Sequence, residues 1–141
     1  MCYLLSRIIL FFCCSFNGRC GMLKEADNVS QHPGEGVRRW FLDDYFDLIV
    51  WYENNIISGF QLCYDKHEFE RCLTWKSETG FSHNKIDGGE TPGQMKMSPI
   101  LVPDGLFDNQ GIADRFMADS RQLPPDLAGF IYQKLLEARV N

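Results

Sequence analysis

The chain has 141 residues, of which 45% are hydrophobic and 23% are charged, a composition typical of one ordinary globular domain. Its 14 Lys and Arg residues and 19 Asp and Glu residues give a formal net charge of -5 at pH 7. A nucleic-acid-binding surface needs a basic patch, and Arg38–Arg39 is a single basic pair, so general binding of DNA or RNA is disfavoured.

The first 21 residues, MCYLLSRIILFFCCSFNGRCG, are apolar and rich in cysteine, unlike the rest of the chain. Arg7 precedes an apolar run that is too short to span a bilayer. Three interpretations remain open: a translated upstream stretch ahead of a true start at Met22, a signal peptide that lacks an A-x-A-like cleavage site, or a peripheral membrane anchor. We favour the start at Met22 and leave residues 1–21 out of the fold prediction.

The next segment, residues 22–37, is polar and contains Pro33, Gly34 and Gly36, which is typical of a flexible lead-in. A single domain is therefore expected over residues 38–141. We expect this domain in the cytoplasm and away from membranes, unless residues 1–21 act as an export signal or an anchor.

Period-two alternation of apolar residues predicts four strands. The first covers residues 46–52 and ends at the turn Glu53-Asn54-Asn55, because Asn tolerates positive φ. The other three cover residues 59–65, 71–75 and 81–87, and the last of them has the weakest pattern. Short consecutive strands separated by turns predict an antiparallel four-stranded meander sheet.

The C-terminal third changes to helical periodicity. Residues 88–99 are rich in Gly and Pro and indicate a loop, and residues 100–102 are a candidate short edge strand. Asp108 is a suitable N-cap for a short helix, and the pair Pro124–Pro125 opens a last helix. The apolar residues of the two helices are Ile112, Phe116 and Met117 in the first and Leu127, Phe130, Ile131, Leu135 and Ala138 in the second. The prediction is an α+β fold with both helices packed on one face of the sheet.

Hydrophobic matching predicts the register of the strands. The pairs Val50–Phe60, Leu48–Leu62 and Phe46–Tyr64, continued by Phe60–Trp75 and Leu62–Leu73, make one face wholly apolar. This register needs a three-residue hairpin loop at 54–56, since an even-length loop would place Leu48 opposite Gln61.

The opposite face then has a mixed composition, which is more apolar than that of an ordinary solvent-exposed surface and more polar than that of a core. Asp47, Cys63 and Cys72 form one row across three strands on it. Its further candidate members are Tyr45, Ile49, Trp51, Gln61 and Thr74. Asp47 lies inside a strand, where Asp is disfavoured, so a local partner or solvent must compensate. His83 joins this face or the Leu73 face as a rim residue, because the register of the fourth strand is open.

Asp43 and Asp44 precede the first strand. Neighbouring residues of an extended chain point in opposite directions, so these two carboxylates are unsuited to a shared acid–base or metal site. We expect them to turn the chain before the strand by accepting bonds from nearby backbone amides.

Cys63 and Cys72 allow several interpretations. They are two small buried hydrophobic residues if the protein is cytosolic, or a cross-strand disulfide if it is exported. A redox or nucleophilic site would combine one of them with His83 as base and Asp47 as orienting group. These four residues have no recognised metal-ligand spacing, so neither a metal nor another cofactor is predicted.

The run WFLDDYFDLIVWY…GFQLCYDK…ERCLTW…GFSHNKID, with KMSPILVPDG and LPPDLAGFIYQKLLE, resembles a group of short uncharacterised bacterial proteins. The resemblance covers residues from about Val37 to the C-terminus. It implies a compact bacterial domain that begins near Arg38, and it implies no activity and no functional residue.

The sequence carries no catalytic signature, so we expect a small non-enzymatic binding or accessory protein. A protein partner or a second copy of the chain is favoured over a small molecule. The binding face would comprise Tyr45, Asp47, Trp51, Gln61, Cys63, Cys72, Thr74 and, if its register allows, His83. The alternatives are the cysteine–histidine enzyme and the exported, disulfide-bridged protein.

Overall fold

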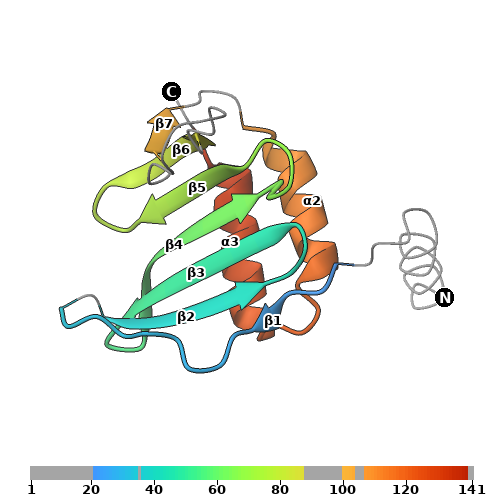
Figure 1. Cartoon of the computed structure of the whole chain (residues 1–141). Coiled ribbons are helices and arrows are strands. Elements are labelled where there is room, and N and C mark those ends of the chain that lie inside the picture. Colours follow the sequence, from blue (N-terminus) through green and yellow to red (C-terminus); the bar gives the residue numbers. More distant parts are fainter. Residues whose placement is uncertain (1–20, 35, 88–99, 104–106, 140–141) are drawn as a thin grey trace, which may run out of the picture.

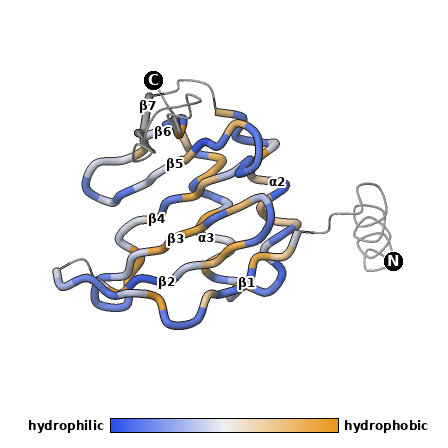
Figure 2. Tube along the Cα trace, viewed as in Figure 1, coloured by the Kyte–Doolittle hydropathy of each residue, from blue (hydrophilic) through white to orange (hydrophobic). Residues whose placement is uncertain are grey.

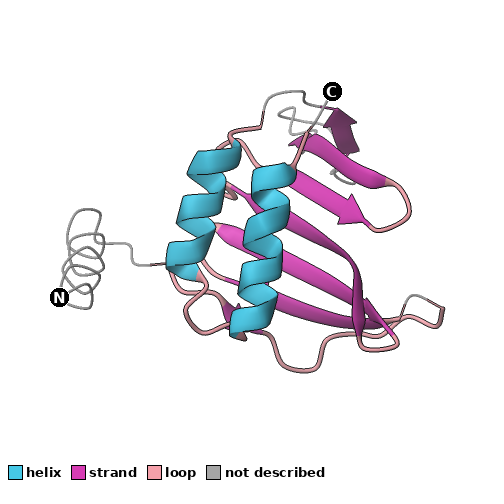
Figure 3. Ribbon diagram, turned by 180° about the vertical axis from the view of Figure 1, so that it is seen from behind, coloured by secondary structure: helices cyan, strands magenta, loops and turns pink. Residues whose placement is uncertain are grey.

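The computed structural model describes residues 21–34, 36–87, 100–103 and 107–139. They form two layers, a curved antiparallel sheet and two helices that cover one of its faces (Figures 1 and 3). The α+β class and the two C-terminal helices agree with the prediction. We call the sheet face under the helices the core face and the opposite one the outer face.

The sheet follows chain order from β1 to β7, and every neighbouring pair is antiparallel. The strands are β1 Lys24–Glu25, β2 Val37–Leu42, β3 Phe46–Glu53, β4 Ile56–Tyr64, β5 Arg71–Lys76, β6 Gly80–Asp87 and β7 Ile100–Pro103. The meander topology is confirmed, but the predicted number of four strands is wrong. Among the described residues, six strands have at least four residues, and the two-residue β1 extends one edge.

Strand β2 was missed because polar and apolar residues mix on both of its faces. Phe41 pairs with Leu48 and points into the core, where it is 2% exposed. Arg39 has the same parity, so no clean alternation appears in VRRWFL. Glu25 of β1 neutralises the Arg39 guanidinium, whose Nε lies 2.8 Å from the carboxylate. The same guanidinium lies 5.0 Å from the centre of the Phe41 ring, a cation–π distance.

Part of the segment predicted as a flexible lead-in is attached to the sheet. β1 pairs with β2, and Leu23 just before it is fully buried. The Leu23 amide donates to the carbonyl of Asp119, the last residue of helix α2 (Asn109–Asp119), at 2.9 Å, which ties the start of the described chain to that helix.

The β3–β4 hairpin has the predicted register but a different loop. The turn has two residues, Asn54 and Asn55, with φ of 53° and 64°, the positive values that a tight hairpin turn needs. Trp51 pairs with Gly59 whereas Tyr52 pairs with Ile57, so β4 has one extra residue at Ser58. This β-bulge restores the Leu48–Leu62 match that a two-residue turn alone would have shifted. The three-residue loop was therefore wrong because a bulge supplies the odd residue.

The core lies between the sheet and the helices. Leu48, Leu62 and Leu73 form a row across three strands, and each is fully buried. Figure 2 shows hydrophobic stretches along β3 and β4 and hydrophilic turns at their ends.

Helix α2, Asn109–Asp119, begins at the predicted cap, since an Asp108 carboxylate oxygen accepts the Gly111 amide at 3.1 Å. It buries Ile112 and Phe116 as expected, but Met117 is 41% exposed. The Asn109 side chain donates to the carbonyl of Leu135 near the end of the other helix and to that of Ala138 just after it, which joins the two C-terminal helices.

Helix α3, Pro125–Glu137, has proline in its first turn, where a missing amide hydrogen costs nothing. Its buried residues are Leu127, Ala128, Ile131 and Leu135. Phe130 is partly buried and contacts the Trp75 ring edge-on, with the two ring centres 5.5 Å apart. None of the helices in the described residues has the length and hydropathy needed to cross a membrane.

Candidate functional site

The outer face contains most of the residues predicted for it, in three adjacent rows. Asp47, Cys63 and Cys72 lie in register with Leu42 and Asn84. The second row contains Trp40, Ile49, Gln61, Thr74 and Ser82. The third contains Arg38, Trp51, Gly59 and Lys76. The predicted pairing of Asp47 with Cys63 and of Cys63 with Cys72 is confirmed.

A hollow of about 290 Å³ opens beside Trp51 on this face. It arises because Gly59 stands between Trp51 and Lys76 and contributes no side chain. The Ser58 hydroxyl donates to the Trp51 carbonyl at 3.2 Å and stabilises the bulge next to the hollow. The lining residues are Gly34, Trp51, Glu53, Ser58, Gly59, Lys76, Ser77 and Glu78.

The hollow has an aromatic wall and an uneven charge. The Lys76 ammonium lies 5.8 Å from the centre of the Trp51 ring, a cation–π distance. Glu53 and Glu78 contribute two carboxylates against this one ammonium. Both carboxylates belong to exposed residues, so a ligand can reach them from solvent.

Trp40 and Leu42 extend the apolar part of the outer face, and the sequence prediction missed both because β2 was missed. They are 38% and 36% exposed. The Trp40 indole donates to an Asp47 carboxylate oxygen at 3.3 Å, and the Lys66 ammonium lies 3.5 Å from the same oxygen. These two contacts are the local partners that an Asp inside a strand requires.

Tyr45 does not belong to the outer face. Its ring lies against the core rings of Phe46 and Tyr64, at centroid distances of 4.8 and 6.5 Å. The Arg115 guanidinium of α2 stacks over it at 3.5 Å. Tyr45 precedes β3, where the period-two rule no longer decides which side a residue faces.

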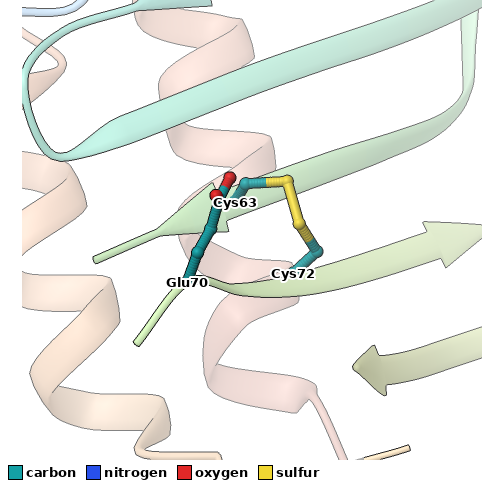
Figure 4. A group of neighbouring side chains, drawn as sticks. All are labelled: Cys63, Glu70 and Cys72. Atoms are coloured by element: carbon teal, nitrogen blue, oxygen red, sulfur yellow. A yellow bond between two sulfur atoms is a disulfide. The ribbon is translucent and has the colours of Figure 1, made fainter. Parts of the chain in front are cut away.

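Cys63 and Cys72 form a disulfide across directly paired strands, with Cα atoms 4.0 Å apart. Figure 4 shows Glu70 beside this bridge. The ligand atoms of the three residues lie within 4.8 Å of one another, but both sulfurs are committed to the disulfide. Burial, and then the charge of Asp47, raise the pKa of Glu70 above its ordinary value. The trio could therefore accept a metal ion only after reduction.

His83 pairs with Leu73 and lies on the core face, opposite the cysteines. It is 2% exposed, so it is a core residue and not the rim residue that this register implied. Its Nε2 is 2.6 Å from the Tyr64 hydroxyl, and its ring stacks on that of Tyr64. The geometry of the cysteine–histidine enzyme is not assembled, because the sheet separates His83 from a disulfide that leaves no free thiol at Cys63 or Cys72.

A second hollow, of about 380 Å³, lies near this pair. It is lined by Tyr64 and Arg71 of the sheet, by Phe107 and Asp108 just before α2, and by Ile112 of α2. Phe107 also contacts the His83 ring, at a centroid distance of 5.2 Å. The histidine thus supports the wall of this hollow through Tyr64 and Phe107.

A pair of carboxyl groups lies where the described chain begins. Asp43 directs one oxygen to the amides of Tyr45 and Phe46, at 2.8 and 2.6 Å, which is the chain-turning role predicted for it. Its other oxygen is buried beside Asp119 at the end of α2. Burial, and then the charge of Asp43, raise the pKa of Asp119 to about 7, against the opposing effect of Arg115. The sequence could not indicate this pair, because its members are 76 positions apart in the chain.

Comparison of the chain with protein-family models, curated proteins and solved structures found no match. The functional argument therefore depends on the geometry of the outer face and of the carboxyl pair. The resemblance to short bacterial proteins stays a prediction.

Proposed function

We propose that this chain is a small non-enzymatic binding protein that holds a partner protein on its outer face. A basic side chain of the partner occupies the hollow beside Trp51. The observation that carries the proposal is the hollow itself, which combines an indole wall with two carboxylates on a face that exposes further apolar side chains.

The apolar surroundings favour a protein over a free small molecule. Trp40 and Leu42 are partly exposed on the same face, with Ile49 between Trp40 and Gln61 in one row. Tryptophan in a desolvated centre, surrounded by less critical contacts, is typical of the residues that dominate protein interfaces. Trp51 lies among such contacts on the outer face, which the helices leave uncovered (Figure 1).

The charge of the hollow favours a basic anchor. Lys76 already lies over the Trp51 ring, so the site is suited to a cation. Glu53 and Glu78 carry two negative charges against the single positive charge of Lys76, and the whole chain has a net charge of -5. An arginine stacks on an indole and pairs with carboxylates through its planar donors, which makes it a better occupant than a lysine.

A second copy of the chain is a weaker candidate for the partner. Two chains of charge -5 repel, and each would present Glu53 and Glu78 to the other. Analytical ultracentrifugation of the protein alone should therefore show a monomer.

Nuclear magnetic resonance with a minimal probe tests the proposal. Nα-acetyl-arginine amide is titrated into ¹⁵N-labelled protein, with the uncharged Nα-acetyl-citrulline amide as the matched control. We expect the Trp51 indole and Gly59 amide resonances to shift with arginine and to shift much less with citrulline. Equal responses to the two probes, or shifts confined to other regions, would refute the basic anchor.

Two variants distinguish specific binding at the hollow from nonspecific binding to exposed aromatic residues. Trp51→Leu removes the wall and should abolish the arginine response. Phe69→Leu changes another exposed aromatic residue, 69% exposed and in the β4–β5 loop, and should leave the response intact. Loss of the response in both variants would contradict a specific site.

The disulfide favours a second proposal, which concerns the compartment. Structural disulfides persist in oxidising compartments, so the Cys63–Cys72 bridge favours export over the cytoplasm. Alkylation of the protein as isolated from its source, followed by mass spectrometry, should leave both cysteines unmodified until a reductant is added. Immediate modification of both would restore the cytoplasmic alternative.

A further inference from the structure

The carboxyl pair of Asp43 and Asp119 surrounds a specific point of the backbone. A Cβ atom placed on Gly21 would lie 2.7 Å from Asp119 Oδ2 and 2.9 Å from Asp43 Oδ2. Two oxygens that belong to different elements thus converge on the first described residue. A side chain at this position would require both carboxylate oxygens to move.

The two oxygens lack donors in the described part of the chain. Both Oδ2 atoms are buried and accept no hydrogen bond there. Asp119 is only 8% exposed, and the Arg115 Nε lies 3.9 Å from its Oδ2, beyond hydrogen-bond length. Two buried carboxylates side by side repel, and they can bond to each other only by sharing a proton. The pair therefore has no positively charged donor at hydrogen-bond distance in the described part of the chain.

The segment that approaches the pair is held in place independently. Leu23 is fully buried and donates its amide to the Asp119 carbonyl at 2.9 Å. Lys24 and Glu25 then pair with β2. These contacts hold Gly21 beside the carboxyl groups.

We propose that the Asp43–Asp119 pair is a binding site for the α-ammonium group of a chain that begins at Gly21. Hydrolysis of the Cys20–Gly21 peptide bond creates this group. Water adds across the bond, leaving a carboxylate on Cys20 and an ammonium on Gly21. The uncut amide offers one N–H and no charge, whereas the ammonium offers three donors and the charge that two buried carboxylates need.

Two further observations agree with a cut at this bond. Gly18-Arg19-Cys20 is not the A-x-A motif whose absence was noted from the sequence, but the residues third and first before the bond, Gly18 and Cys20, are both small. The Cys63–Cys72 disulfide independently favours a chain that reaches an oxidising compartment. These two observations do not depend on the Trp51 hollow, so the ammonium site can be tested independently of the proposed function.

The experiment compares one protein before and after a cut. Residues 15–20 of the full chain are replaced by the recognition sequence of a site-specific protease that cuts directly before a glycine, so that Gly21 becomes terminal. A matched control has Gly-Ser inserted before Gly21, which moves the new ammonium two residues away. Tm is measured at pH 7 for both proteins, uncut and cut.

We expect the cut to raise Tm by about 3 °C or more in the first protein and to leave it unchanged in the control. The substitution Asp119→Asn should change Tm in opposite directions in the uncut and cut proteins, which the loss of a merely structural aspartate would not do. It should raise Tm in the uncut chain, where it removes repulsion, and lower Tm in the cut chain, where it removes the ammonium's partner.

Amine labelling provides a readout that does not depend on stability. At pH 7 the terminal amine of the cut protein should react with acetic anhydride at least ten times more slowly than in its Asp119→Asn variant. Equal labelling rates, equal Tm changes in the two cut proteins, or a Tm rise of the uncut chain with Ca²⁺ or Mg²⁺ alone would overturn the proposal.

Discussion

Asp43 uses its two carboxylate oxygens for different purposes. One accepts two backbone amides and turns the chain into β3, and the other lies with Asp119 beside Gly21. The first role was predictable, because an Asp before a strand commonly accepts such bonds. The second was not, because it depends on where the last turn of α2 meets the edge of the sheet. Asp44 is exposed, as a residue pointing the other way should be.

The raised pKa of Asp119 predicts how stability depends on pH. Its folded pKa of about 7 lies above its ordinary value of 3.8, so the folded protein binds the proton more tightly than the unfolded chain does. The associated stability is fully present below about pH 4 and is lost as the pH rises through 7. The charged groups around the carboxyl group are Asp43, Arg115 and Arg121.

Asp119→Asn should remove this dependence in the uncut chain. Relative to wild type, we expect the variant to gain roughly 1–3 kcal/mol at pH 8 compared with pH 4, after allowance for screening by solvent. Urea unfolding at the two pH values measures the difference. A variant whose stability follows the wild-type curve in parallel would show that Asp119 titrates normally.

At the scale of elements, apolar matching was enough to align β3, β4 and β5. Leu48, Leu62 and Leu73 leave one register that buries them all, and the structure adopts it. Apolar matching failed where polar and apolar residues do not alternate cleanly along the strand. β2 has Arg39 on its core-facing parity, and a two-residue turn with a bulge gives the same register as a three-residue loop. A bulge cannot be seen in alternation alone, although Gly59 next to it was a signal.

Gly59→Ala tests the close approach of strands at the bulge. A Cβ there would lie 2.8 Å from the Trp75 carbonyl oxygen, which belongs to the backbone and cannot rotate away. We expect a loss of about 1–3 kcal/mol in unfolding free energy, together with a weaker arginine response at the hollow. Gly129→Ala is the matched control, since nothing lies within 4 Å of its Cβ position. If both substitutions leave stability unchanged, β4 and β5 are not held as closely as described.

At the scale of the whole molecule, one layer of helices leaves the other sheet face open. That asymmetry was predictable, because the residues matched across β3, β4 and β5 make one face apolar and leave the other mixed. The composition of the open face was predicted only in part. Trp51, Gln61 and Thr74 lie there as expected, whereas Tyr45 and His83 lie on the core side. The prediction for Tyr45 failed because Tyr45 precedes the regular strand, and the side of His83 had been left open because the parity of β6 has no dominant apolar side.

The central claim is that the Trp51 hollow binds a basic side chain, and its charge dependence tests this most directly. The measurement is the dissociation constant of Nα-acetyl-arginine amide for wild type and for the Glu53→Gln/Glu78→Gln double variant, followed at the Trp51 indole resonance. The account predicts binding at least three times weaker in the variant, because two exposed ion pairs are lost. An unchanged or smaller dissociation constant would contradict it.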